Sequence, residues 1–270
     1  MYKITPSSGS DVQIVNSSHE VYYGYKHRNN YVDFRTSTPI ELLNRFTSTP
    51  SCRDKYFLYR TPGLEYEKQN IEFDPYVLGL WLGDGNSYAP CITTEDYEVE
   101  NYLTEFARLH NMDTRKELLP NNNACNIHFI CTENSERGYN NHKINYFLKS
   151  LKKLNVYKNK HIPEQYIYNS REVRLNLLAG LIDTDGWYES KSKAFGFSQC
   201  ESRKQMAYDV LFIARSLGMK ASIRKKKINK PCGVCRYSTV EDQYVVKILS
   251  GCEQIPTKIA RKRASGDKTW

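Results

Sequence analysis

The chain has 270 residues, with 39 Lys or Arg against 30 Asp or Glu, so its formal net charge is +9. It contains no run of about twenty apolar residues, and its first residues lack the apolar core of a secretory signal, so we expect neither a membrane span nor a leader. We therefore expect an intracellular chain whose 8 cysteines are reduced thiols rather than a disulfide framework.

The positive charge lies at the C-terminal end. Residues 220–270 contain 13 Lys or Arg and 4 Asp or Glu, a surplus of nine that equals the net charge of the whole chain. A localised basic stretch is the electrostatic signature of a polyanionic partner, although a solvated basic tail would give the same count.

Residues 1–73 are predicted to form a β-rich segment. Runs rich in aromatic and β-branched residues, separated by turn residues, predict short strands at 2–5, 11–15, 20–25, 31–35 and 56–60. Thr38 followed by Pro39 predicts the start of a short helix that ends near Phe46.

Residues 74–169 and 170–270 are predicted to be two copies of one unit. In the first copy the expected order is a helix begun by Asp74 and Pro75, then a strand at 88–93, a helix at 96–110, strands at 114–118 and 125–132, and a helix at 143–154. In the second copy it is a helix begun by Ser170, a hairpin at 187–189 and 194–199, a helix at 203–217, strands at 220–227 and 244–249, and a short basic end.

A repeated stretch that ends in Asp-Gly marks the duplication. Val77–Gly85 reads Val-Leu-Gly-Leu-Trp-Leu-Gly-Asp-Gly, and Leu178–Gly186 reads Leu-Ala-Gly-Leu-Ile-Asp-Thr-Asp-Gly. When the two stretches are aligned on Asp84 and Asp185, small residues match at two positions, Gly79 with Gly180 and Gly83 with Thr184. These positions stand four apart and share one helix face, so two such helices can approach closely. The pair indicates an internal duplication and an α+β fold.

The two acids predict a metal site. If the helices pack through their small residues, both carboxylates reach one place at the negative ends of two helix dipoles. Like charges raise one another's pKa, and a bridging divalent cation removes that conflict. Oxygen-only ligands favour Mg²⁺, with Mn²⁺ or Ca²⁺ as substitutes. Beside a basic surface, such a site predicts hydrolysis of phosphodiester bonds, whereas a single Asp-Gly would be interpreted only as a helix end.

The two motifs resemble those of the LAGLIDADG homing endonucleases in their single-chain, two-motif form, over residues 74 to about 263. The flanking segments resemble more narrowly the endonuclease domains of inteins of the yeast vacuolar ATPase type. The resemblance implies a pseudo-twofold αββαββα saddle on a DNA major groove, and a monomer that acts as a pseudo-dimer. It also implies double-stranded DNA with a long specific site as the partner and Mg²⁺, with Mn²⁺ as a possible substitute, as the cofactor.

The same resemblance assigns site residues. The last acid of each motif binds the metals in this family, which corresponds to Asp84 and Asp185, and we include the preceding Gly83 and Thr184 in the metal site. A lysine in each active site corresponds to Lys160 and to Lys262, with Lys258 as the alternative to Lys262 and phosphate contact as an equally good role for these two. Secondary polar groups near the metals correspond to Glu95, Ser198 and Gln199.

Long polar side chains on the strands are the candidates for contact with DNA. Base edges and phosphates would be read by Arg115, Lys116, Lys191, Lys193, Arg224, Lys225, Lys226, Lys227 and Lys247. Since strand residues alternate between faces, only half of the run 224–227 is expected to face the groove.

The first segment resembles part of an intein splicing domain. Ile4–Val21 carries Asn16-Ser17-Ser18-His19, where Asn16 stands in place of the usual Thr of a Thr-x-x-His motif. Met1 is not a nucleophile and the chain does not close on His-Asn, so we expect no protein splicing.

Three alternatives stay open. The chain could be a catalytically inactive DNA-binding protein of this fold, an RNA maturase, or a degenerate intein. Cys232 and Cys235, with Cys252, could also form part of a zinc site, but a fourth ligand at suitable spacing is not evident.

Overall fold

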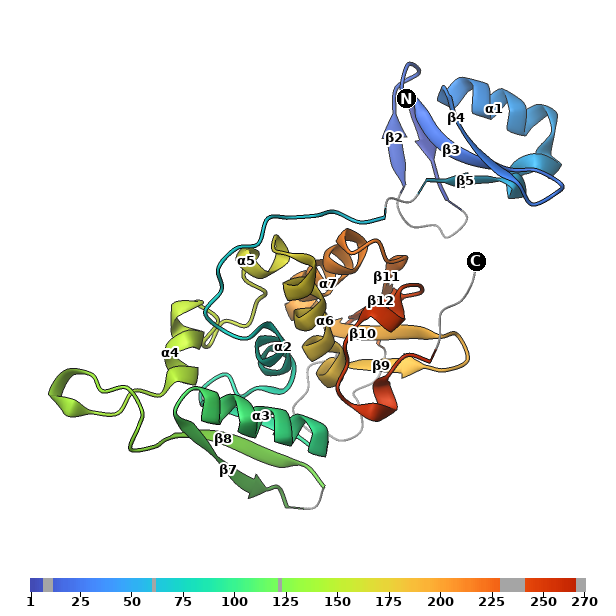
Figure 1. Cartoon of the computed structure of the whole chain (residues 1–270). Helices are drawn as coiled ribbons and strands as arrows, with labels where there is room; N and C mark the ends of the chain where they lie inside the picture. The colour runs from blue at the N-terminus through green and yellow to red at the C-terminus, as the bar shows by residue number, and fades with distance from the viewer. Residues whose placement is uncertain (7–11, 60–61, 121–122, 229–240, 266–270) are drawn as a thin grey trace. The chain divides into compact units, whose positions relative to one another are not determined.

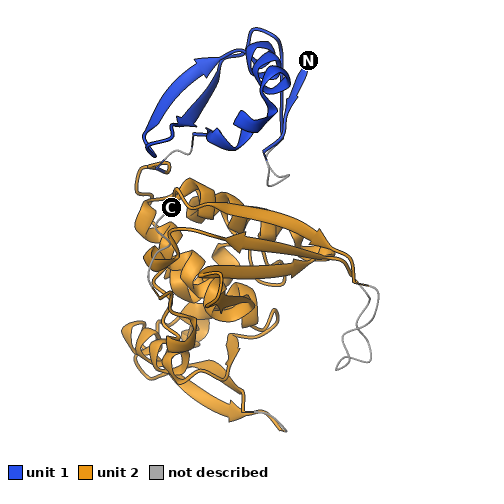
Figure 2. Ribbon diagram, turned by 90° about the vertical axis from the view of Figure 1, so that its right-hand side faces the viewer, with its two compact units in different colours: residues 1–62 blue, residues 63–270 orange. Residues whose placement is uncertain are grey.

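The computed structural model describes residues 1–6, 12–59, 62–120, 123–228 and 241–265. Cys232 and Cys235, the candidate zinc ligands, lie outside these residues. The chain divides into two compact units, residues 1–62 and 63–270 (Figure 2). Among the described residues, no helix is long and apolar enough to cross a membrane.

The first unit is a small β-rich body, as its composition predicts. Strands β1 (Tyr2–Ile4) and β2 (Gln13–Val15) pair with each other, and a second sheet has the order β4 (Val32–Ser37), β3 (Val21–Lys26), β5 (Tyr56–Leu58). Helix α1 (Pro39–Ser48) is followed by a 3₁₀ turn, η1 (Pro50–Lys55). Thr38 caps α1 as predicted: its hydroxyl accepts from the Glu41 amide at 3.4 Å and its own amide donates to the Glu41 carboxylate at 2.8 Å.

The second unit holds two repeats that share the order helix, strand, helix, strand, strand, and the second repeat has one more strand directly after its first helix (Figure 1). The first repeat contains α2 (Pro75–Asp84), β6 (Cys91–Thr94), α3 (Tyr97–Leu109), β7 (Met112–Leu118), β8 (Cys125–Cys131), η2 (Tyr139–Asn141), α4 (Tyr146–Lys153) and α5 (Glu164–Ile167). The second contains α6 (Arg171–Asp185), β9 (Gly186–Glu189), β10 (Ala194–Cys200), η3 (Glu201–Arg203), α7 (Lys204–Ser216), β11 (Ala221–Lys226), β12 (Gln243–Ile248), η4 (Cys252–Gln254) and η5 (Ala260–Lys262).

The two repeats share one sheet topology. Their antiparallel sheets have the orders β6-β8-β7 and β9-β10-β12-β11. The place of β9 is taken in the first repeat by a single bridge between Gly85 and Ile92, which matches the pairing of Gly186 with Phe197. The strands β6, β7 and β8 thus correspond to β10, β11 and β12, and the predicted α+β fold built by duplication is confirmed.

Segment 63–73 belongs to the second unit and not to the β-rich segment predicted over residues 1–73. The Leu64 amide donates to the Ser216 carbonyl at 2.7 Å, and the buried Arg174 guanidinium donates to the Leu64 carbonyl at 2.6 Å. Further along the chain, the backbone amide of Gln69 donates to the side-chain oxygen of Asn169 at 3.1 Å. These long-range hydrogen bonds, which composition does not reveal, place the boundary between the units at residue 62.

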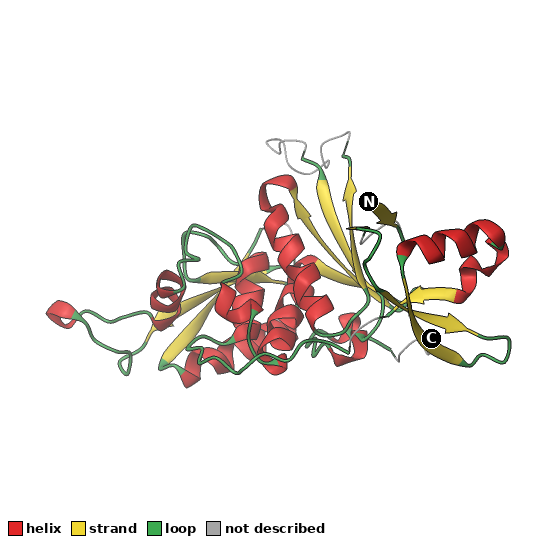
Figure 3. Ribbon diagram, turned by 90° about the horizontal axis from the view of Figure 1, so that it is seen from above, coloured by secondary structure: helices red, strands yellow, loops and turns green. Residues whose placement is uncertain are grey.

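Helices α2 and α6 pack against each other at the centre of the second unit (Figure 1), and helices lie between its two groups of strands when it is seen from above (Figure 3). Every residue from Tyr76 to Leu82 is buried, as expected for a helix that is apolar on all sides. The helices touch through their backbones: a Cβ on Gly180 would lie 2.2 Å from the Tyr76 carbonyl oxygen, and one on Gly79 would lie 2.5 Å from that of Leu177. This contact brings the C-terminal ends of both helices together.

Candidate active site

Asp84 and Asp185 are the last residues of α2 and α6. Each is followed by a glycine in extended conformation whose amide closes the last helical turn, Gly85 on Trp81 and Gly186 on Ile182. Since the two helices pack against each other along their small residues, the two carboxylates lie in one electrostatic environment at the negative ends of two helix dipoles.

The protonation of both acids reflects this placement. Asp84 is open to solvent on one side, yet desolvation, followed by repulsion from the Asp185 carboxylate, raises its pKa from 3.8 to about 6. Burial also raises the pKa of Asp185, against the opposing effect of Gln199, whose amide donates to the Asp185 carboxylate. Without a cation, the site therefore resists carrying two negative charges.

Lys160 occupies the end of the first helix. Its ammonium donates to the carbonyls of Gly83 at 3.1 Å and Gly85 at 2.6 Å, and lies 5.0 Å from the centroid of the Trp81 ring. Desolvation, followed by the nearby charge of Arg203, lowers the pKa of Lys160 to about 8. This lysine is therefore partly neutral in mildly alkaline solution.

Lys262 occupies the equivalent end of the second helix. Only 6% of this residue is exposed, and its ammonium donates to three carbonyls, those of Ile182 at 3.0 Å, Asp183 at 2.8 Å and Thr184 at 3.1 Å. Burial lowers its pKa. Lys258, the alternative from the sequence, has its ammonium over the rings of Tyr76 and Tyr102, at 4.9 and 4.4 Å from their centroids, and not at the helix end.

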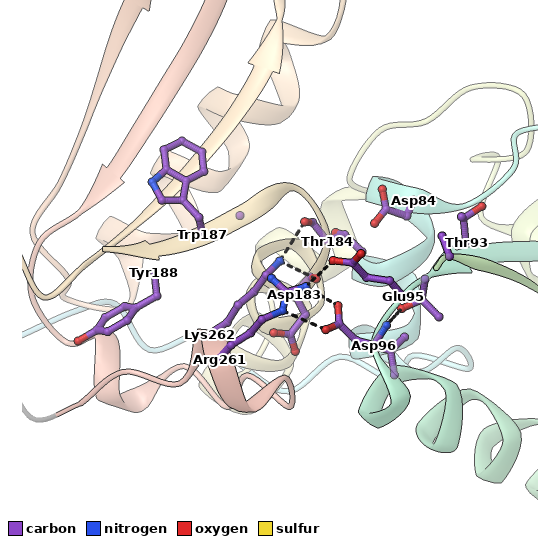
Figure 4. A pocket seen from close by; sticks show the side chains of 14 residues that line it. Asp84, Thr93, Glu95, Asp96, Asp183, Thr184, Trp187, Tyr188, Arg261 and Lys262 are labelled. Atoms are coloured by element: carbon purple, nitrogen blue, oxygen red, sulfur yellow. Dashed lines mark hydrogen bonds and ion pairs between the residues drawn. The ribbon is translucent and has the colours of Figure 1, made fainter. Parts of the chain in front are cut away.

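A cavity of about 480 Å³ opens beside Asp84 (Figure 4). Its wall combines both repeats: Asp84 and Thr93 come from the first, and Thr184, Trp187 and Lys262 from the second. Another part of the wall is an ion-paired group in which the Arg261 guanidinium binds Glu95 at 3.1 Å and Asp96 at 2.8 Å. The cavity is large enough to admit a phosphate group.

The donor atoms fit a hard divalent cation. Among the described residues, no cluster of three or more His, Cys, Asp or Glu side chains is placed to hold a metal, so the candidate side-chain ligands in this part of the chain are the two aspartates. Mg²⁺ commonly binds through one or two carboxylates and takes its other ligands from water and phosphate. The expected contribution of Gly83 and Thr184 is limited, because their carbonyls already accept from Lys160 and Lys262, and the Thr184 hydroxyl donates within its own helix.

The three polar residues expected near the metal site, Glu95, Ser198 and Gln199, lie in different surroundings. Gln199 reaches an acid, because its amide donates to Asp185. Ser198 points to the opposite face of β10, since neighbouring strand residues alternate. Glu95 lines the cavity with Asp84 but is paired with Arg261.

The DNA-contact candidates on the first sheet also divide by face. Lys116 of β7 points toward α3, where it pairs with Glu100 at 2.5 Å, and so does Thr114, whose hydroxyl lies 3.1 Å from that of Thr104. Arg115 therefore lies on the other face, which we call the open face of the sheet. Lys116 and Arg115, both expected to contact DNA, therefore lie on opposite faces of the first sheet.

The second sheet repeats this division. Lys225 of β11 is directed to the α7 side, where it pairs with Glu201 at 2.7 Å and with Asp242 at 3.2 Å. Arg224, Lys226 and Lys247 lie on the open face, which for this sheet is the face away from α7. Lys191 and Lys193 lie in the turn between β9 and β10, and Lys227 follows β11.

Three site residues were not identified from the sequence. Asp183 is 4% exposed and anchors the segment that carries Lys262, because its carboxylate accepts from the Tyr76 hydroxyl at 2.8 Å and the Lys258 amide at 2.7 Å. Arg261 and Trp187 line the cavity. The position of Trp187 directly after the repeated Asp-Gly is the one signal in the sequence that could have identified it.

Parts of the chain are similar to known proteins. Residues 161–268 match the family model described as homing endonuclease. The replicative DNA helicase DnaB of Mycobacterium intracellulare is 28% identical over 207 residues, which are 77% of this chain but 30% of that relative. A structure of I-DmoI with DNA and Mn has 14% identity and a TM-score of 0.41 over 65% of this chain and 88% of that one. A structure of mesophilic variants of the homing endonuclease I-DmoI has 14% sequence identity and a TM-score of 0.40, over 65% of this chain and 87% of that one.

Desolvation of Asp84, together with repulsion from Asp185, predicts a pH-dependent gain in stability when Asp84 is replaced. The pKa of Asp84 is raised on folding, so its favourable contribution is fully present below about pH 4 and is lost as the pH rises through about 6. In metal-free buffer, Asp84→Asn should therefore melt higher than wild type at pH 8, by about 2 °C, and at nearly the same temperature at pH 4. Thermal unfolding followed by circular dichroism measures this difference.

Glu105→Gln, which removes an exposed acid from α3, is the control for loss of charge alone and should show no such gain. Added Mg²⁺ should raise the melting temperature of wild type and not that of Asp84→Asn. Equal melting temperatures for wild type and Asp84→Asn at pH 8 would contradict the electrostatic account.

Proposed function

We propose that the chain is a site-specific double-strand DNA endonuclease that hydrolyses phosphodiester bonds with a divalent metal held between Asp84 and Asp185. The observation that carries this proposal is the presence of two equivalent helix ends at one interface, each with an acid and a lysine. The match of residues 161–268 to the homing endonuclease model supports it, because that range contains Asp185 and Lys262.

The chain's own residues would place the substrate and move a proton. A bound divalent cation would supply Lewis-acid stabilisation of charge on the phosphate. The two acids would fix its position, and Gln199 would hold the Asp185 carboxylate in place. Two described carbonyls account for two of the three N–H bonds of Lys160, and its pKa of about 8 allows it to exchange a proton with an attacking water.

Lys262 is assigned a different role. Its three N–H bonds already meet three carbonyls, so it would act mainly by holding the end of α6 and by placing positive charge beside the scissile phosphate. The two halves of the site would then cut their strands unequally, although the repeats share one fold.

Double-stranded DNA would lie on the open faces of the two sheets. Arg115 on the first sheet and Arg224, Lys226 and Lys247 on the second present long cationic side chains there, suited to phosphates and guanine edges. The two-motif arrangement supplies both halves of the contact from one chain, so the protein would act as a monomer. Because the candidate ligands are carboxylate oxygens, Mg²⁺ would be its natural cation.

The first unit would be the remnant of an intein splicing domain. Support for this origin is the stretch from Asn16 to His19, in which the Ser18 hydroxyl donates to the Asn16 side chain at 3.1 Å. The unit has its own small core around Val21, Tyr23 and Leu42.

Cleavage of plasmid DNA tests the activity. Wild type, incubated with Mg²⁺ and a pool of supercoiled plasmids that carry randomised inserts, should linearise a reproducible subset of the pool. Asp84→Asn and Asp185→Asn should each lower double-strand cleavage at least about a hundredfold, because each removes half of the shared metal site. Lys160→Met should accumulate nicked circles, because it disables one strand's proton transfer.

A chelator should stop the reaction in wild type, and Glu105→Gln is again the matched control. If wild type cuts no better than the two aspartate variants, the nuclease proposal is wrong and the inactive DNA-binding protein replaces it.

Substitutions on the two faces of β11 test the DNA surface. Affinity for a random duplex of about 30 base pairs, measured by fluorescence anisotropy in Ca²⁺ across a range of salt, falls with salt according to the number of phosphates neutralised. Lys226→Ala on the open face should lower the slope of log affinity against log salt by about one. Lys225→Ala, whose ammonium is bound to Glu201 and Asp242, should leave it nearly unchanged. Equal effects of the two variants would exclude the open face as the DNA surface.

A further inference from the structure

Trp187 is placed where it can read the DNA beside the cut. It is the second residue after Asp185, at the start of β9, and 37% of it is exposed. In the register of the second sheet, Trp187 of β9 lies opposite Gly196 of β10, and Gly196 lies opposite Lys247 of β12. Residues opposite each other on neighbouring strands share a face, so all three lie on the open face. Trp187 is also one of the residues that line the cavity with Asp84, Thr184 and Lys262, and its indole points away from these side chains (Figure 4).

A glycine forms the seat of the indole. A Cβ on Gly196 would lie 2.2 Å from Cε2 and 2.3 Å from Cζ2 of the Trp187 ring, so the ring lies directly on the bare backbone of β10. The Lys247 ammonium is 5.3 Å from the ring centroid and is held by Glu189 at 2.9 Å. The indole is therefore fixed before any ligand arrives, and a fixed aromatic surface loses little freedom on contact.

The first repeat lacks this feature. When the repeats are aligned on Gly85 and Gly186, Asn86 stands at the position of Trp187 and Cys91 at that of Gly196. The backbone amide of Asn86 donates to the Cys91 carbonyl at 2.9 Å. The aromatic surface thus belongs to one half of a site that is otherwise built twice, which is the pattern expected of recognition and not of shared chemistry.

We propose that Trp187 is a specificity-determining residue that contacts the base pair beside the scissile phosphate in the half-site bound by the second repeat. This inference rests on the proposed nuclease function. With a phosphate held at the acids, the neighbouring nucleotide would lie along the open face at the start of β9, where the indole presents a large apolar face and no acceptor. Such a face favours a T·A pair, whose thymine methyl group is the apolar feature of the major groove.

Sequencing of DNA that is bound in Ca²⁺, and separately cut in Mg²⁺, from the randomised plasmid pool tests this inference. For wild type, one position beside the cut should favour T·A, and Trp187→Ala should reduce that preference by roughly fivefold to tenfold while the other half-site stays unchanged. Gly196→Ala, which removes the seat of the ring, should alter the same position. Trp187→Phe should retain the preference, because it keeps an apolar ring.

Asn86→Ala is the matched control in the first repeat and should leave this position unchanged. If Trp187→Ala binds and cuts with the wild-type preferences, the inference is wrong and the nuclease proposal stands. If wild type binds selectively but does not cut, the nuclease proposal fails, and the bound pool alone decides the role of Trp187. A wild-type pool with no preference at the position overturns the inference.

Discussion

The close contact of two helix backbones at Gly79 and Gly180 is the constraint on which the second unit depends. Because a Cβ at either position would collide with carbonyl oxygen of the other helix, the axes can come this close only where both side chains are absent. The consequence appears one turn further on, where both helices end and Asp84 and Asp185 meet. The fold thus buries two neighbouring carboxylates, a cost that a bound cation would offset. Desolvation raises the pKa of both acids, and repulsion from Asp185 adds to the shift of Asp84.

Lys160 and Lys262 donate hydrogen bonds to carbonyl groups at the two converging helix ends. Two helix ends that converge also bring together the carbonyl groups of their last turns, and an ammonium group at each end donates to them. Lys262 donates to three carbonyls of α6, of which that of Ile182 also accepts from the Gly186 amide. Lys160 donates to the carbonyl of Gly83 in α2 and to that of Gly85, which follows the helix. The two halves therefore differ at the lysines and at Trp187, while each keeps one acid as the last residue of its helix.

Much of this arrangement could be predicted from the sequence, and the exceptions have a common cause. The helices around Asp84 and Asp185 were predicted because their apolar pattern, caps and terminal glycines are local signals. The faces of Lys116 and Lys225 could not be predicted, since they depend on strand register. The part played by Asp183 depends on residues far away in the chain, Tyr76 and Lys258, and no local pattern marks it.

Binding of Mn²⁺, followed by electron paramagnetic resonance with wild type and the two single aspartate variants, tests most directly whether the acids form one site. The account predicts that Asp84→Asn and Asp185→Asn each lose the bound ion seen in wild type, and that the double variant loses no more than either. Retention of wild-type Mn²⁺ affinity by either single variant would show that the two helix ends do not share a cation, and would contradict the account.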